Sequence, residues 1–208
     1  MTSVVVAHGL YMPGSELFLL RRRLVRAGFV ARQFRYRTIV HDVDRSAASL
    51  AEHVAAVPGD TVHLIGHSLG GIVILKMIEH FGIERIGRIV SLGSPFCGSV
   101  AAANLRRLPG GKYLLGRAMA QANQEAAERS WNGARELGVI AGDRARGMGR
   151  LLGPLPKPND GTVAVAETRL PGATDHIVLP VTHFSMLWSA DVADQVVAFL
   201  RDGRFDRQ

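Results

Sequence analysis

The chain of 208 residues contains a single cysteine, Cys97. One cysteine excludes an intramolecular disulfide, so no internal cross-link stabilises the fold. No apolar run approaches the roughly 20 residues that a membrane-spanning helix needs. The stretch TSVVVAHG near the N-terminus follows no basic segment and is too short for the apolar region of a signal peptide. We therefore expect a cytoplasmic protein in which residues 1–208 form one domain.

Aromatic residues are scarce, at 6%, although the formal net charge is +7. The arginines are spread along the chain and no nucleic-acid-binding module is recognisable, so we expect no nucleic acid partner. The basic stretch RRRLVR at 21–26 leaves peripheral contact with an anionic membrane open. The sequence leaves the oligomeric state open as well.

Patterns that bind metals or nucleotides are also missing. The sequence has no cysteine pair, and no helix is expected to carry two histidines at i and i+4 with a glutamate. The glycine-rich stretch GHSLGG lacks the Lys-Ser or Lys-Thr of a phosphate-binding loop. We therefore expect neither a metal nor a cofactor.

Short runs rich in β-branched residues alternate with longer helical patterns. Continuous apolar strands separated by helices predict a three-layer α/β fold, with a mostly parallel sheet of about six strands and helices on both faces. Reactive groups in such sheets gather beyond the carboxyl ends of the strands. Strands are expected at 3–7, 29–36, 61–66, 88–92, 138–141 and 175–179, and helices at 16–27, 46–57, 70–81 and 190–200.

Two stretches fit this alternation less well. Residues 96–136 are mainly helix-forming and could make a small cap over a site, so the expected cap is minimal. Residues 142–161 are rich in glycine, proline and arginine, which favours a surface loop.

The stretch LIGHSLGG at 64–71 places Ser68 between glycines, after an apolar strand and before an apolar helix. Alone, a G-x-S-x-G match in a glycine-rich chain is weak, but a strand–turn–helix context makes it informative. Gly66 and Gly70 would give the clearance that lets the serine hydroxyl project above the sheet edge. The sequence therefore predicts that Ser68 is a nucleophile, against the simpler interpretation of a tight turn.

A serine hydroxyl is a poor nucleophile unless a base removes its proton. The base should be a histidine in a loop beyond the last strand, because the chain order of this architecture is Ser, then Asp or Glu, then His. His183, in LPVTHFSML, is the only histidine downstream of the last expected strand. We predict that His183 is the base, the alternative being a packed loop histidine.

The acid that would orient His183 has several candidates. Asp160, in KPNDGTVAV, follows the fifth strand in an Asn-Asp-Gly turn that would present a carboxylate. Asp143 is nearer the end of that strand, Asp175 precedes the sixth strand and so should lie at the opposite sheet edge, and Glu167 lies in a helical or extended segment. We favour Asp160, which would hold the imidazole tautomer and stabilise the imidazolium.

The oxyanion formed by the attack needs at least two N–H donors. One should be the backbone N–H of Leu69, directly after the serine, and the other that of Leu10, in the loop AHGLYMPG after the first strand. Tyr11 could line an acyl pocket. The alternative is a glycine-rich loop without donors.

Together, HGLYMPG, GHSLGG, LGSPFCGS, NDGTVAVAETRLPG and DHIVLPVTHFSML resemble the α/β-hydrolase superfamily, in particular its small lipases and esterases. The resemblance runs from Val4 to about Trp188. It implies a Ser-Asp-His triad of Ser68, Asp160 and His183. LGSPFCGS is similar to the GTPHxGS stretch of lipases, with Phe96 at the histidine position. The small cap argues against interfacial activation by a large lid.

The expected function is therefore hydrolysis of a small-molecule or lipid-like carboxylic ester through an acyl-enzyme. Thioester hydrolysis, amide hydrolysis and acyl transfer use the same machinery and remain alternatives. A non-catalytic binding domain of the same fold is the alternative of a different class. The apolar residues of the cap segment could set acyl length, although at helical spacing such residues more often belong to a core. They are Leu105, Leu108, Tyr113, Leu114, Leu115 and Met119.

Overall fold

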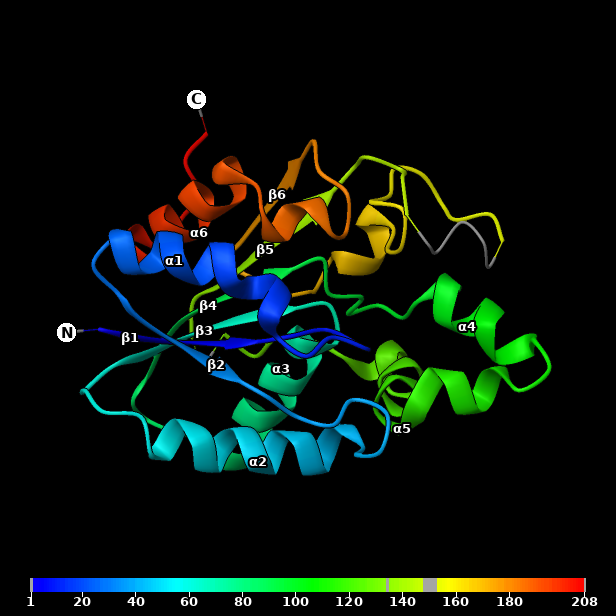
Figure 1. Ribbon diagram of the computed structural model, residues 1–208, viewed down its shortest axis with the longest axis horizontal. Coiled ribbons are helices and arrows are strands. Elements are labelled where there is room, and N and C mark those ends of the chain that lie inside the picture. Colours follow the sequence, from blue (N-terminus) through cyan, green and yellow to red (C-terminus); the bar gives the residue numbers. More distant parts are fainter. Residues whose placement is uncertain (1, 134, 148–152, 208) are drawn as a thin grey trace.

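Six parallel strands form one sheet in the computed structural model, which describes residues 2–133, 135–147 and 153–207 (Figure 1). The spatial order of the strands is β2-β1-β3-β4-β5-β6. The strands are β1 (Ser3–Ala7), β2 (Val30–Phe34), β3 (Val62–His67), β4 (Ile86–Leu92), β5 (Leu137–Gly142) and β6 (Asp175–Leu179).

The strand order reverses between β1 and β3. The chain goes from β1 outward to β2 and then returns to the other side of β1, where Val5 pairs with both Arg32 of β2 and Leu64 of β3. Adjacent crossovers leave in opposite directions at such a point, and ligands of open α/β sheets bind there, outside the carboxyl ends of the strands. The topology therefore predicts a binding site at the carboxyl ends of β1 and β3. These ends lead into Gly9 and Ser68.

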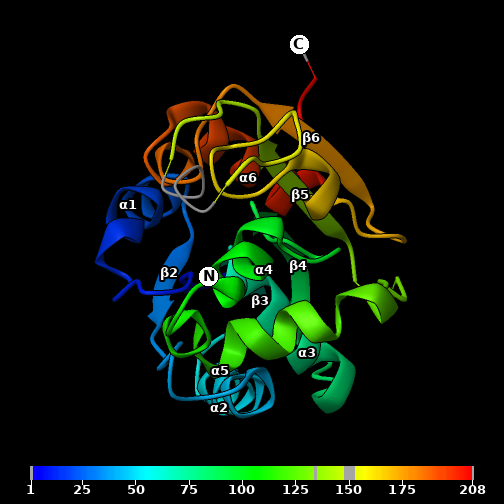
Figure 2. The ribbon, with the colours of Figure 1, turned by 90° about the vertical axis from the view of Figure 1, so that its right-hand side faces the viewer.

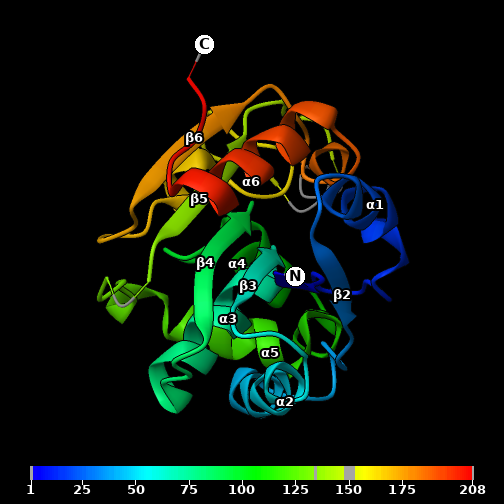
Figure 3. The same ribbon diagram turned by 90° about the vertical axis from the view of Figure 1, so that its left-hand side faces the viewer.

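Helices cover both faces of the sheet, as expected. Figures 1 and 3 show α1 and α6 on one side of the sheet and α2 and α3 on the other. Every residue of β1 is buried, and its side chains alternate between two apolar clusters, with Val4 facing α1 and α6 and Val5 facing α2 and α3. The helices are α1 (Phe18–Arg26), α2 (Val43–Ala55), α3 (Leu69–Phe81), α4 (Val100–Arg107), α5 (Gly111–Gln124) and α6 (Ala190–Asp202).

Residues 96–136 fold mainly into α4 and α5, which contact each other and follow the carboxyl end of β4. Figure 2 shows both helices on the face of the molecule beyond the strand ends, in front of β3 and β4. α5 is broken at Gly116, where φ is 71° and ψ is 167°. The described parts of 142–161 contain no helix and one isolated bridge between Asn159 and Ala164, and residues 148–152 lie outside the described residues.

In the described part of the chain, no helix combines the length and the apolar character needed to cross a membrane.

Candidate active site

Ser68 occupies the turn between β3 and α3 in a conformation that L-residues rarely adopt, with φ 54° and ψ −121°. Backbone strain of this kind costs about 1–3 kcal/mol and persists only where the surroundings impose it. Two glycines make the turn possible: a Cβ on Gly70 would lie 2.5 Å from the carbonyl oxygen of Ala7, and one on Gly66 would overlap the Gly71 backbone. Ser68 is partly exposed, whereas His67 and Leu69 on either side of it are fully buried. The turn therefore presents the serine at the carboxyl edge of the sheet.

His183 and Asp160 form a buried hydrogen-bonded pair. The Nδ1 of His183 lies 2.7 Å from Oδ2 of Asp160, and the side chains are 5% and 1% exposed. The backbone N–H of His183 also donates to the Asp160 carbonyl oxygen, at 2.9 Å. With Asp160 ionised, Nδ1 carries the proton and the neutral ring keeps a lone pair on Nε2. That arrangement leaves His183 able to accept a proton.

The Asn-Asp-Gly turn and the contact with His183 use different oxygens of Asp160. Oδ1 accepts from the backbone N–H groups of Thr162 and Val163, at 2.9 and 2.7 Å, which closes the turn. Oδ2 remains for the imidazole. Asp160 can therefore close the turn and bind His183 at the same time.

The other acidic candidates lie in different surroundings. Asp143 is exposed and lies 3.8 Å from Arg144, and Asp175 begins β6 at the opposite sheet edge, where it pairs with Arg207. Glu167 is buried, but its carboxylate accepts from the backbone N–H groups of Val100 and Ala164, at 2.6 and 2.7 Å. Burial raises the pKa of Glu167. Of the four, Asp160 is the one hydrogen-bonded to His183.

The loop after β1 lies against the serine turn. A Cβ on Gly9 would be 3.0 Å from the Ser68 Cβ, so only glycine fits without a shift of the neighbouring atoms. The Leu10 N–H has no hydrogen-bond acceptor among the described residues. Leu69 is the first residue of α3, and the first N–H groups of a helix have no acceptor within the helix. Both predicted donors thus belong to segments that meet at Ser68.

His8 fixes the conformation of this loop. Its ring stacks on Tyr36 with centroids 4.6 Å apart, its Nδ1 lies 3.0 Å from the Gly9 carbonyl oxygen, and its Nε2 accepts from the Tyr36 N–H at 3.4 Å. This pattern requires the neutral tautomer with the proton on Nδ1. Burial lowers the pKa of His8, which favours the same form.

His67 makes a contact that the sequence did not indicate. Its ring lies 4.6 Å from the ring of His183, and its Nε2 is 3.1 Å from the His183 carbonyl oxygen, so Nε2 carries the proton. Its Nδ1 is buried without a partner among the described residues. Burial, and next the nearby His183, lower the pKa of His67 well below its usual value. The residue before the serine is therefore a neutral donor to the His183 loop, across 116 positions of sequence.

The apolar residues predicted for an acyl pocket divide into two groups. Leu115 and Met119 are buried in the core between the sheet and α2, α3 and α5, and Leu105 packs against that core. The exposed group lies at the surface, with Tyr113 74% exposed. This group comprises Tyr11, Leu108, Tyr113 and Leu114.

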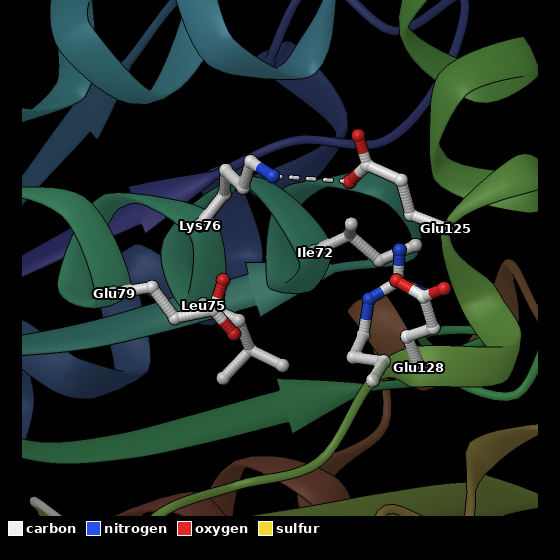
Figure 4. A pocket seen from close by; sticks show the side chains of 7 residues that line it. Ile72, Leu75, Lys76, Glu79, Glu125 and Glu128 are labelled. Carbon is white, nitrogen blue, oxygen red and sulfur yellow. Dashed lines mark hydrogen bonds and ion pairs between the residues drawn. The ribbon is translucent and has the colours of Figure 1, made fainter.

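A separate pocket of about 320 Å³ lies between α3 and the end of α5 (Figure 4). Its charged side chains are largely engaged within the protein: Lys76 lies 3.2 Å from Glu125, and Arg129 donates to the carbonyl oxygens of Phe96 and Ala122. These contacts connect the end of α5 and the residues after it to α3 and to the segment after β4. No group of three or more histidine, cysteine, aspartate or glutamate side chains suited to a metal ion occurs among the described residues.

Comparison with known proteins gives one family and several similar folds. The alpha/beta hydrolase family model matches residues 4–205. The fold is similar to that of the lipase BlEst2 of Bacillus licheniformis in its mature form, with a TM-score of 0.76 and 21% identity over 98% of this chain and 92% of that chain. The metagenomic carboxyl esterase MGS0156 is similar with a TM-score of 0.70 and 22% identity, over 89% of this chain and 65% of that chain.

Polyneuridine aldehyde esterase has a TM-score of 0.63 and 14% identity, over 97% of this chain and all of that chain. No curated protein sequence matches the chain. Identities at this level show a common fold.

Proposed function

The chain belongs to the alpha/beta hydrolase family, and from that premise we propose that it is a serine hydrolase that cleaves carboxylic esters through Ser68, His183 and Asp160. The observation that carries the proposal is the buried hydrogen bond of 2.7 Å between His183 and Asp160. This hydrogen bond joins a base and an acid that lie beyond the carboxyl ends of the strands. Ser68 adopts its strained turn at the same edge of the sheet.

In the proposed reaction, the Ser68 hydroxyl attacks the ester carbonyl while His183 Nε2 accepts its proton. The imidazolium that forms carries protons on both nitrogens, and Asp160 Oδ2 stabilises it through the Nδ1–H bond. His183 then gives its proton to the leaving alcohol, which departs and leaves an acyl group on Ser68. A water molecule then attacks the acyl carbon while the same imidazole accepts its proton. The bond between the acyl carbon and Ser68 Oγ breaks, the imidazolium returns the proton to Oγ, and the acid is released.

The backbone N–H groups of Leu10 and Leu69 are proposed to stabilise the oxyanion of each tetrahedral intermediate. The N-terminus of α3 adds its positive dipole end at the same place. Each donor of this kind contributes about 10²- to 10³-fold in kcat. His8 and His67 are proposed to position these groups, because one fixes the loop of Leu10 and the other bonds the backbone of His183.

The proposed substrates are small-molecule or lipid-like esters. The support is the similarity in fold to a lipase and to two esterases, together with the apolar residues around the α4–α5 segment.

Hydrolysis of a series of p-nitrophenyl esters of increasing acyl length tests the proposal. We expect turnover on at least part of the series, and we expect Ser68→Ala to lower kcat by about 10⁴-fold or more. Ser185→Ala is the matched control, since Ser185 begins the short 3-10 helix after His183 and its hydroxyl oxygen accepts from the Thr182 N–H. The kcat of this variant should stay near that of the unmodified protein. Failure of the folded protein to hydrolyse any member of the series would refute the esterase assignment.

A further inference from the structure

Exposed apolar side chains gather around the turn between α4 and α5. Leu108, Tyr113 and Leu114 are 49%, 74% and 57% exposed, and Ile39 and Val40 of the β2–α2 loop are 39% and 55% exposed. We call these five residues the hairpin tip. Contiguous exposed apolar surface on a soluble domain usually marks a place where another surface binds.

The two segments of the hairpin tip are in direct contact. The Arg117 N–H donates to the Ile39 carbonyl oxygen at 3.0 Å, and the kink at Gly116 lets α5 approach the Ile39 backbone so closely that a Cβ would lie 2.8 Å from its Cα. Ile39, Val40 and Tyr113 line one groove of about 380 Å³, together with Lys112 and Arg117. The β2–α2 loop and the start of α5 therefore share one surface at this groove.

This surface is positively charged without acidic residues in its helices. Residues 85–124 contain no aspartate or glutamate. Arg106, Arg107, Lys112 and Arg117 are all exposed, and the Lys112 ammonium lies 4.9 Å from the centre of the Tyr113 ring. Apolar side chains at a protruding turn, flanked by lysine and arginine, are the combination that binds anionic lipid surfaces.

We infer that the hairpin tip docks on an anionic phospholipid surface, with Leu108, Tyr113 and Leu114 inserted at the interface and the four basic residues paired with lipid phosphates. A second copy of the chain is a poor occupant, because a symmetric dimer would bring Arg106, Arg107 and Lys112 close to their own equivalents. Figure 2 shows α4 and α5 on the face beyond the strand ends, the edge that carries Ser68. Docking there would turn that edge toward the lipid.

The basic stretch RRRLVR fits this role less well. In α1, Leu20 and Leu24 are buried against the sheet, and Arg23 donates to the Trp188 carbonyl oxygen. Helix α1 runs back from the carboxyl edge of β1, so Arg26 lies at the other end of the molecule. The stretch that the sequence suggested for membrane contact thus becomes the matched control.

Co-sedimentation with vesicles tests the inference. We expect binding to vesicles of equal parts phosphatidylcholine and phosphatidylglycerol, much weaker binding to phosphatidylcholine alone, and a decline as salt is added. The variant Arg106→Gln/Arg107→Gln should lower partitioning by about tenfold or more, and Tyr113→Ser/Leu114→Ser should lower it as well. The matched variants Arg22→Gln/Arg26→Gln and Phe81→Ser, which change exposed residues elsewhere, should bind like the unmodified protein.

Three results would overturn the inference. They are no binding to the anionic vesicles, an equal loss of binding in the two double-arginine variants, and a dimer in sedimentation equilibrium that Tyr113→Ser/Leu114→Ser dissociates. Vesicle binding does not depend on the proposed hydrolysis. Turnover of a short soluble ester therefore tests the hydrolysis separately, and Arg106→Gln/Arg107→Gln should leave this turnover unchanged.

Discussion

At the scale of single residues, the two carboxylate oxygens of Asp160 have different partners. One carboxylate oxygen closes the Asn-Asp-Gly turn and the other binds the His183 ring. The turn needs only an acceptor, which an amide can also provide. The ring needs an acceptor at Nδ1, so that the proton stays there and Nε2 keeps its lone pair.

Asp160→Asn should therefore remove activity without unfolding the protein. Its amide oxygen can still close the turn, but its NH₂ group at Nδ1 would force the proton onto Nε2, and kcat on a nitrophenyl ester should fall by about 10⁴-fold. Asp143→Asn, at an exposed position on the neighbouring loop, is the matched control and should keep its kcat. Full activity in the Asp160 variant would show that another group orients His183.

Gly70 allows α3 to begin directly after Ser68, against the end of β1. In Gly70→Ala the new methyl group would meet the Ala7 carbonyl oxygen at 2.5 Å, and the free energy of unfolding should fall by about 1–3 kcal/mol. Gly82→Ala, at a positive φ but with open space around it, isolates the cost of the left-handed conformation, about 1–2 kcal/mol. Urea unfolding measures both. An unchanged midpoint for Gly70→Ala would contradict the tight approach of α3 to β1.

At the scale of the elements, the sequence patterns located the strands and the helices α1, α2, α3 and α6 more accurately than they located the ends of these elements, whereas α4 and α5 were expected only as a mainly helix-forming segment. The sequence predicted a helix at 46–57, and α2 begins at Val43, because the Asp42 side chain accepts from the Arg45 N–H at 2.9 Å and caps the helix. The break of α5 at Gly116 was not predicted either, because it depends on the contact with Ile39, far away in the chain.

The sequence was likewise informative about local motifs of the site, but not about contacts between residues far apart in the chain. Ser68 and His183 were indicated by local motifs, and the Asn-Asp-Gly turn pointed to Asp160. The contacts of His67 with the ring and backbone of His183 join positions 116 residues apart and leave no local pattern. The G-x-S-x-G motif around His67 points to Ser68 and says nothing about a contact with His183.

Loss of the α2 cap should be measurable. Asp42→Ala leaves the Arg45 N–H without its acceptor, and the free energy of unfolding should fall by about 1 kcal/mol. Asp42→Asn keeps the side-chain oxygen and should restore most of the loss. Equal destabilisation by both substitutions would mean that the charge, and not the hydrogen bond, stabilises the helix.

At the scale of the whole molecule, the histidines couple stability to pH. Burial is the main cause of the lowered pKa of several histidine side chains, namely His8, His53, His63, His67 and His176. The neutral rings fit the folded protein, and protonation is easier in the unfolded chain, whose histidines have the ordinary pKa of about 6.5. Between a pH of about 6.5 and the lowered pKa values of the folded protein, the unfolded chain therefore binds more protons than the folded protein does.

The free energy of unfolding should therefore fall as the pH drops below about 6.5, and it should stop falling once the folded pKa values are passed. Urea unfolding at about pH 7.5 and about pH 5.5 measures the change through its midpoint. His67→Asn removes the ring with the most strongly lowered pKa and should reduce the pH dependence, whereas His80→Asn, at an exposed position, should not. A stability that rises on acidification would contradict the burial of neutral rings.

The most direct test of the central claim, that Ser68 is an activated nucleophile, is labelling of the native protein with a fluorophosphonate and mapping of the adduct by mass spectrometry. Ser68→Ala and His183→Ala serve as comparisons. We predict a single adduct on Ser68, absent from Ser68→Ala and strongly reduced in His183→Ala. The absence of an adduct from the folded protein, or an adduct on another serine that both variants retain, would contradict the claim.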